Sequence, residues 1–469
     1  MAISDLADPL TRSLGGLVSA VTAPFSDTVI RLGVTGLSRA GKTVFITGLV
    51  ANLLDRGRMP QLRAAGRIEA VWLQPQPDDT IPRFDFEGHL AALTGADPRW
   101  PESTRAVSEL RLSFRVKPAG LLAGLTGTRT VHLDIVDYPG EWLLDLALLD
   151  KGYAEWAEDV LGRLARRKVG ADYLATARAE DGALPFEEAR AQALAAAFTR
   201  YLHAARAEGW SDCTPGRFLL PEELAGSPVL TFAPLPAPAA AGRGSLWREM
   251  ERRYDAYRTK VVKPFFREHF LRIDRQVVLV DLLGAIHAGP QALEDLRRTM
   301  AGILAAFRPG RNGLLSEILL GRRVERILFA ATKADHLHHR QHPQLAAITE
   351  ALVREARDRA AFAGAEVAAM SLAGLRATVE EQVARDGRVL DMVRGRLLST
   401  GRQAAMYPGE LPSDPSRLLS PAREGAERWL EADFALMGFA PARAALRPGE
   451  GPPHIRLDRA AEFLIGDRL

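Results

Sequence analysis

The sequence predicts an α/β fold in which a mixed, mostly parallel sheet carries helices on both faces. Short apolar runs typical of buried strands recur along the chain, at residues 30–35, 107–117, 129–136, 276–282, 326–331 and 365–370. Longer segments with the period of an amphipathic helix separate several of these runs. Strands that alternate with helices are typical of a sheet covered on both sides.

The first strand leads directly into a glycine-rich loop. Residues 36–43 fit the pattern G-x-x-x-x-G-K-[ST], and an apolar helical segment follows at residues 44–54. In such a P-loop, backbone N–H groups close around the α- and β-phosphates of a nucleotide. Lys42 is expected to reach the β- and γ-phosphates, and the Thr43 hydroxyl to coordinate Mg²⁺. The residues predicted to line the nucleotide are Ser38, Arg39, Ala40, Gly41, Lys42, Thr43 and Val44.

A second strand, at residues 129–136, ends in Asp137-Tyr138-Pro139-Gly140, which matches D-x-x-G. At a strand end Asp137 can hold Mg²⁺ through a water molecule, and the Gly140 N–H can contact a γ-phosphate. Pro-Gly is also ordinary turn chemistry, so the motif alone leaves a plain turn open. Its place downstream of a P-loop, on another apolar strand, favours a phosphate site.

A third motif, Thr332-Lys333-Ala334-Asp335, follows the strand at residues 326–331 and is similar to the [NT]-K-x-D base-reading motif of GTPases. The Asp335 carboxylate would accept both N1–H and the exocyclic N2–H₂ of guanine, and the Lys333 stem would lie along the base. Thr332 replaces the commoner Asn and lacks its amide. Ser371 and Leu372, after the next strand, are similar to the loop whose N–H contacts the guanine carbonyl. The predicted cofactors are GTP or GDP, with Mg²⁺.

The first switch is predicted just before the strand at residues 107–117, where GTPases place a threonine that closes on Mg²⁺ and the γ-phosphate. Thr104 occupies this place, and Ser103 is the alternative. A hydroxyl that only caps a turn remains the structural explanation. The predicted Mg²⁺ ligands are therefore Thr43, Thr104 and Asp137.

The order of the motifs predicts a Ras-like G domain, with a mostly parallel sheet, interrupted by an insertion. We expect an N-terminal helix in residues 1–29, the nucleotide-binding domain in residues 30–140 and 271–375, a helical insertion domain in residues 141–270, and a small C-terminal α+β extension in residues 376–469. The insertion is Ala-, Arg- and Glu-rich with helical periodicity and directly follows D-x-x-G. This placement would couple the nucleotide state to a large moving part, so the insertion is the expected surface for a protein effector.

Composition limits the other partners. The net charge of the 469-residue chain is only +3, and basic residues are dispersed among acidic ones, which disfavours nucleic-acid binding. One cysteine excludes internal disulfides and fits a cytoplasmic location. No apolar run approaches the roughly 20 residues of a membrane span. The N-terminal helix could touch a membrane surface, but it lacks a row of Lys and Arg, which favours packing on the nucleotide domain. The oligomeric state stays open.

The P-loop segment at residues 34–43, the run Asp137-Tyr138-Pro139-Gly140-Glu141-Trp142, the strand at residues 278–282 and the ending at residues 454–459 together resemble the YcjX-like family of bacterial P-loop NTPases. The resemblance covers nearly the whole chain. It implies a cytoplasmic, stress-associated protein that binds guanine nucleotides.

Three functions fit these observations. The first is a Mg²⁺-dependent GTPase with Lys42, Thr104, Gly140 and Glu141 as the catalytic residues. Glu141 stands where many GTPases carry a water-orienting Gln, and its negative charge beside a γ-phosphate predicts slow turnover. Candidate charge neutralisers are Arg39, Arg99 and Arg105. The alternatives are an ATPase with Glu141 as the activating carboxylate, and a nucleotide-stabilised interaction module with little catalysis.

Overall fold

The computed structural model describes residues 27–36, 39–102, 106–118, 127–269, 272–305, 324–362, 364–385, 387–429, 434–443 and 446–469. The predicted N-terminal helix lies outside these residues. The first described element is instead a strand that begins at Thr28, so the last two residues of the range 1–29 belong to the sheet.

The main sheet has seven strands in the order β2-β3-β4-β1-β5-β6-β7. Five neighbours run parallel, namely β4 (Arg129–Asp137), β1 (Thr28–Gly36), β5 (Arg275–Val280), β6 (Arg326–Ala331) and β7 (Glu366–Ser371). β3 (Ser108–Val116) is antiparallel to β4, and β2 (Ile68–Gln74) is antiparallel to β3. The predicted mixed, mostly parallel α/β sheet is therefore confirmed.

Both faces of this sheet are buried, as expected for parallel strands. In β5, Val277 and Leu279 contribute to one hydrophobic core, whereas Val278 and Val280 contribute to the other. The first core contains α2 (Lys42–Leu54) and α15 (Leu457–Ile465), and α3 (Phe86–Thr94) contacts α2. The second contains α11 (Leu282–Ala288), α12 (Pro290–Ala305) and α13 (His342–Phe362). Successive side chains of a strand point to opposite faces, which explains the division.

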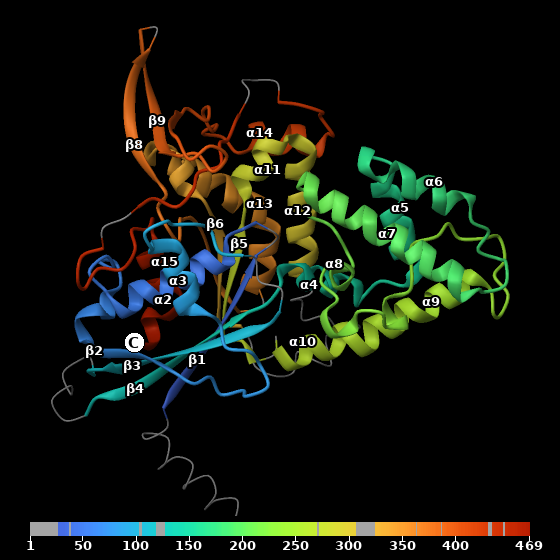
Figure 1. Cartoon of the computed structure of the whole chain (residues 1–469), viewed down its shortest axis with the longest axis horizontal. Coiled ribbons are helices and arrows are strands. Elements are labelled where there is room, and N and C mark those ends of the chain that lie inside the picture. The colour runs from blue at the N-terminus through green and yellow to red at the C-terminus, as the bar shows by residue number, and fades with distance from the viewer. Residues whose placement is uncertain are drawn as a thin grey trace, which may run out of the picture.

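Residues 140–269, here called the helical segment, connect β4 to β5. Its helices are α4 (Gly140–Leu144), η3 (Asp145–Leu148), α5 (Tyr153–Leu164), η4 (Lys168–Gly170), α6 (Ala171–Ala179), α7 (Glu188–Glu208), α8 (Gly216–Leu219), η5 (Glu222–Leu224), η6 (Pro228–Leu230), α9 (Leu246–Tyr257), the π-helix η7 (Arg258–Val262) and α10 (Lys263–His269). Figure 1 shows α5, α6, α7 and α9 gathered on one side of the sheet. Aromatic rings fill their interior, with Trp156 stacked on Tyr254 at a centroid distance of 4.9 Å.

The hydrophobic core of the helical segment is continuous with the second core of the sheet. No separate core therefore marks a boundary within the described residues, and the division into an insertion domain and a nucleotide-binding domain stays a prediction. The packing instead makes the segment a direct neighbour of the sheet's second face.

The C-terminal residues form two different structures. β8 (Thr378–Arg385), β9 (Arg388–Arg396) and β10 (Gln403–Met406) make a separate three-stranded sheet, whose β8–β9 hairpin projects from the molecule in Figure 1. α14 (Ser416–Arg423) packs on α12. The chain then returns to the main sheet through α15, which shares the core of α2, and ends with η11 (Gly466–Arg468).

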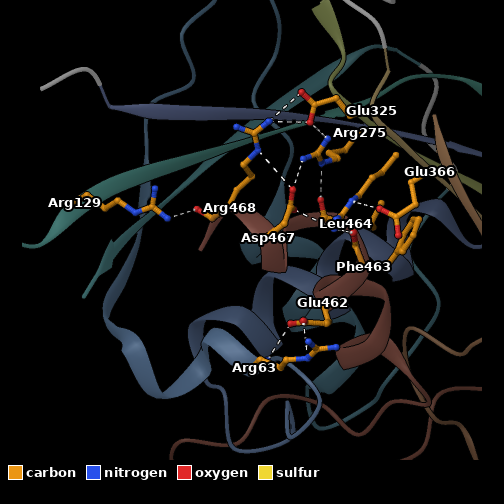
Figure 2. A network of polar contacts seen from close by, with 11 residues as sticks. Arg63, Arg129, Arg275, Glu325, Glu366, Glu462, Phe463, Leu464, Asp467 and Arg468 are labelled. Carbon is orange, nitrogen blue, oxygen red and sulfur yellow. Dashed lines mark hydrogen bonds and ion pairs between the residues drawn. The ribbon is translucent and has the colours of Figure 1, made fainter. Parts of the chain in front are cut away.

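A polar network fastens this C-terminal end to the amino ends of the strands (Figure 2). Arg275, 1% exposed at the start of β5, donates to the Leu464 carbonyl at 3.0 Å and to Asp467 at 2.8 Å, and it also pairs with Glu325. Arg326, at the start of β6, donates to the Phe463 carbonyl at 2.7 Å. The carboxyl ends of the parallel strands, at the opposite edge of the sheet, carry the sequence motifs.

Candidate functional site

The P-loop has the backbone shape of an anion-binding loop. Arg39 and Gly41 both have positive φ angles, 66° and 79°. At Gly41 a Cβ would meet no protein atom within 4 Å, but the left-handed backbone favours glycine. At Gly36 a Cβ would lie 2.9 Å from that of Leu279, so a side chain is excluded by packing. Ala40 is buried; Ser38 lies outside the described residues.

Helix α2 begins at Lys42 with no acidic residue in its first turn and no side-chain cap. The positive end of its dipole is therefore available to an anion. Lys42 and Val44 are half-buried, and Thr43 is 7% exposed. The Phe45 N–H donates to the Gly41 carbonyl at 2.9 Å, which fixes the loop to the helix.

Asp137 and Thr43 carry oxygen atoms of the kind that bind Mg²⁺. Asp137 is buried at the carboxyl end of β4, and the parallel register pairs it with Val34 of the strand that feeds the P-loop. Carboxylate and hydroxyl oxygens are the hard ligands that Mg²⁺ takes alongside water and phosphate. The donor set therefore fits the ion. Thr104 lies outside the described residues.

The third motif and the loop after β7 hold each other through backbone hydrogen bonds. The Ala334 N–H donates to the Leu372 carbonyl at 3.1 Å, and the Leu372 N–H donates to the Ala331 carbonyl at 2.8 Å. Lys333 takes a left-handed conformation, φ 60°, and its ammonium group pairs with Asp281. Thr332 is buried. The structure thus brings Thr332, Lys333 and Asp335 together with Ser371 and Leu372.

Asp335 is a buried carboxylate whose charge is stabilised. Burial alone raises its pKa, but the nearby His336, whose Nδ1 lies 3.5 Å from Asp335 Oδ1, and the Ala377 N–H, which donates to Asp335 at 2.9 Å, outweigh burial and lower the pKa below its usual range. The group is therefore an acceptor at neutral pH. Two residues that the motifs did not indicate support this region: Arg456 donates to Ser371 Oγ at 2.8 Å, and His342 Nε2 lies 2.8 Å from the Ala334 carbonyl.

Helix α2 and the loop after β7 meet at two glycines. A Cβ at Gly48 of α2 would lie 2.3 Å from the Gly374 carbonyl oxygen, and a Cβ at Gly374 would lie 2.9 Å from the Phe45 Cα. Helix α2 and the loop after β7 are therefore in backbone contact. This contact and the hydrogen bonds between the loop after β7 and the third motif place the P-loop helix and that motif at one edge of the sheet.

Glu141 is buried in the first turn of α4, directly after Gly140, which is also buried. Its carboxylate faces α7 of the helical segment. Arg206 of α7 forms an ion pair with Glu141, at 2.6 Å from Oε1. The angles at this oxygen are not those of a hydrogen bond. The predicted neutralisers Arg39 and Arg99 are exposed, and Arg105 lies outside the described residues. No local pattern distinguished Arg206 from the other arginines of its helix, because the pairing spans two distant segments.

Three further contacts fix α4 and the residue after it to the rest of the helical segment. Asp145 accepts from the Gly216 N–H at 2.7 Å and from the Tyr257 hydroxyl. Burial raises the pKa of Asp145 to about 7, although these hydrogen bonds and the Arg217 charge oppose the shift. The Arg217 guanidinium lies 3.3 Å from the centroid of the Trp142 ring. The loop after β4 is thus held by α7, α8 and α9.

The sheet order, the P-loop and the two further motifs at the carboxyl ends of the strands define a Ras-like P-loop protein. The chain belongs to the YcjX-like family: the family model described as "YcjX-like family, DUF463" matches residues 30–469. The protein named "Ras-like GTPase YcjX" from Escherichia coli (strain K12) is 39% identical to it, over 94% of this chain and 96% of that protein. The protein of the same name from Shewanella oneidensis is 36% identical, over 95% of each. The predicted family resemblance is confirmed.

None of the helices in the described part of the chain is both long and apolar enough to cross a membrane.

Proposed function

We propose that this protein is a cytoplasmic, Mg²⁺-dependent GTPase with slow intrinsic turnover, which acts as a nucleotide-controlled switch in a bacterial stress response. Asp335 carries the guanine assignment, because it is a buried, ionised acceptor. Its loop is hydrogen-bonded to the loop after β7, and that loop contacts the P-loop helix. Guanine offers two donors to such a carboxylate, whereas adenine offers no matching pair. The names of both relatives include GTPase, which supports the same activity. The stress role rests on family resemblance.

In this proposal the residues act mainly by positioning and by balancing charge. Lys42 and the P-loop N–H groups hold the phosphates, while Thr43, Asp137 and Thr104 hold Mg²⁺, which neutralises charge on the β- and γ-phosphates. The Gly140 N–H contacts the terminal phosphate, and Glu141 orients the attacking water. A carboxylate is repelled by that phosphate more than a neutral Gln would be, so turnover is slow.

The contacts of α4 support a switch. The D-x-x-G loop continues into α4 without a linker, and α7, α8 and α9 all contact α4 or the residue after it. A change at the terminal phosphate would therefore be passed to the helical segment, which we propose as the surface for a protein effector. The carboxylate of Glu141 also suits an ATPase, which is the second candidate.

The test compares the stabilisation of the protein by GDP, ADP and xanthosine diphosphate in thermal melts with Mg²⁺. GDP should raise the melting midpoint more than ADP. Asp335→Asn should weaken GDP binding by about 10- to 100-fold and favour the xanthine nucleotide, because the lost acceptor matched guanine donors. Asp97→Asn, at a side chain that is 82% exposed, is the control and should behave as wild type. Equal stabilisation by ADP and GDP would refute guanine specificity.

A further inference from the structure

The helical segment places a positive charge against the carboxylate that follows D-x-x-G. Arg206 lies in the last turn of α7, and its side chain is 24% exposed, whereas that of Glu141 is 6% exposed. The ion pair, at 2.6 Å, is therefore largely shielded from water. Shielding strengthens both the attraction within the pair and the cost of leaving Glu141 alone.

The backbone of Glu141 is fixed as well. A Cβ at Gly216 of α8 would lie 2.1 Å from the Glu141 carbonyl oxygen and 3.0 Å from the Trp142 nitrogen, so α8 passes directly against α4. Asp145, one turn further along, accepts the Gly216 N–H. Glu141 is thus enclosed at its backbone by α8 and paired at its carboxylate with α7.

A fixed carboxylate next to Gly140 presents an electrostatic problem for a nucleoside triphosphate. The terminal phosphate is an anion, and like charges in one site oppose each other's ionised form. A diphosphate lacks that group and escapes most of the repulsion. A cation paired with Glu141 removes the problem, and Arg206 is the cation that the structure places there.

We propose that Arg206 is a positioning residue that neutralises Glu141, so that this carboxylate can stand beside the terminal phosphate of a bound nucleoside triphosphate. The helical segment thereby supplies a charge that the strands and the P-loop do not bring to Glu141. This inference rests on the proposed function. Its consequence is that the preference for triphosphate over diphosphate depends on a residue outside the nucleotide motifs.

The experiment measures the dissociation constants of GDP and of a non-hydrolysable GTP analogue by calorimetry, with Mg²⁺ present. Arg206→Ala should weaken the analogue about tenfold and leave GDP within about twofold, because only the analogue meets the unpaired carboxylate. The double variant with Glu141→Gln should recover most of the loss, since the repelling charge is gone. Arg206→Lys should lie between. Arg200→Ala, an exposed arginine of the same helix, is the matched control.

Two results would overturn the role of Arg206: equal weakening of both nucleotides by Arg206→Ala, or a double variant as weak as the single one. A thermal melt of each variant without nucleotide shows whether the variant is folded. If Arg206→Ala does not fold, the affinities of Arg206→Lys and of the double variant for GDP and the GTP analogue test the role of Arg206 instead. If wild type prefers adenine nucleotides, the guanine proposal fails separately, and the same variants measured with ADP and an ATP analogue then decide the role of Arg206.

Discussion

The close approach of α8 to α4 allows a sharp test of how the helical segment is joined to the D-x-x-G loop. In Gly216→Ala the new Cβ would lie 2.1 Å from the Glu141 carbonyl oxygen and 2.4 Å from its carbonyl carbon. Both are backbone atoms, so no side chain can rotate away. Ordinary contact begins near 3.4 Å, and the two segments would have to separate by about 1.3 Å.

That separation has an energetic cost that can be bounded. Extra volume forced into a packed interior typically costs about 1–3 kcal/mol. Because Gly216 is buried and its neighbours are backbone, we expect a value near the upper end, about 3 kcal/mol. For a chain of 469 residues the loss corresponds to a fall of roughly 3 °C in the melting midpoint. The shift should also lengthen the Gly216 hydrogen bond to Asp145.

Thermal unfolding followed by circular dichroism is the assay, with Gly162→Ala as the control. Gly162 lies inside α5, and a Cβ there would meet nothing within 4 Å. Since alanine is the better helix former, this control should be neutral or stabilising by about 0.5–1 kcal/mol. A Gly216→Ala protein that melts within 1 °C of wild type, as measured beside the control, would refute the backbone contact.

Two further variants test other parts of the site. Gly48→Ala should lower both the melting midpoint and the affinity for GDP, because its Cβ would lie 2.3 Å from the Gly374 carbonyl oxygen; wild-type values for both would contradict the contact. In wild type, the free energy of unfolding should fall as pH rises from about 4 to about 7, because folded Asp145 keeps a proton that the unfolded chain releases. This one group lowers the free energy of unfolding by at most about 1.4 kcal/mol per pH unit. Asp145→Asn should flatten urea-unfolding free energies over this range, and an unchanged slope would exclude the shifted pKa.

Local patterns predicted the main strands well. β6 has the predicted bounds, and β1, β4 and β7 differ from prediction by two residues or fewer at each end, because apolar runs bounded by turns are a local signal. β2 was not predicted. Its residues are mostly half-buried at the edge of the sheet, so their pattern is weak, and pairing with β3 decides that they form a strand.

The positions of the motif residues followed from the topology. Parallel strands end at one edge of the sheet, so Asp137, Asp335 and the P-loop come to the same edge once β4, β1, β5 and β6 are neighbours. The roles assigned to Lys42, Thr43 and Gly140 remain predictions. The position of α15 could not be read from the sequence. This helix shares the hydrophobic core of α2 and not that of β8–β10.

The sequence by itself determined the phosphate loop, the D-x-x-G and T-K-x-D motifs and most of the strands, because each depends on residues within a few positions of one another. Only the tertiary structure decided that Arg206 meets Glu141, that Gly216 lies against the same residue, and that α15 fastens the amino ends of the strands. These contacts join segments far apart in the chain. Their geometry depends on how whole helices pack, and residue spacing carries no record of it.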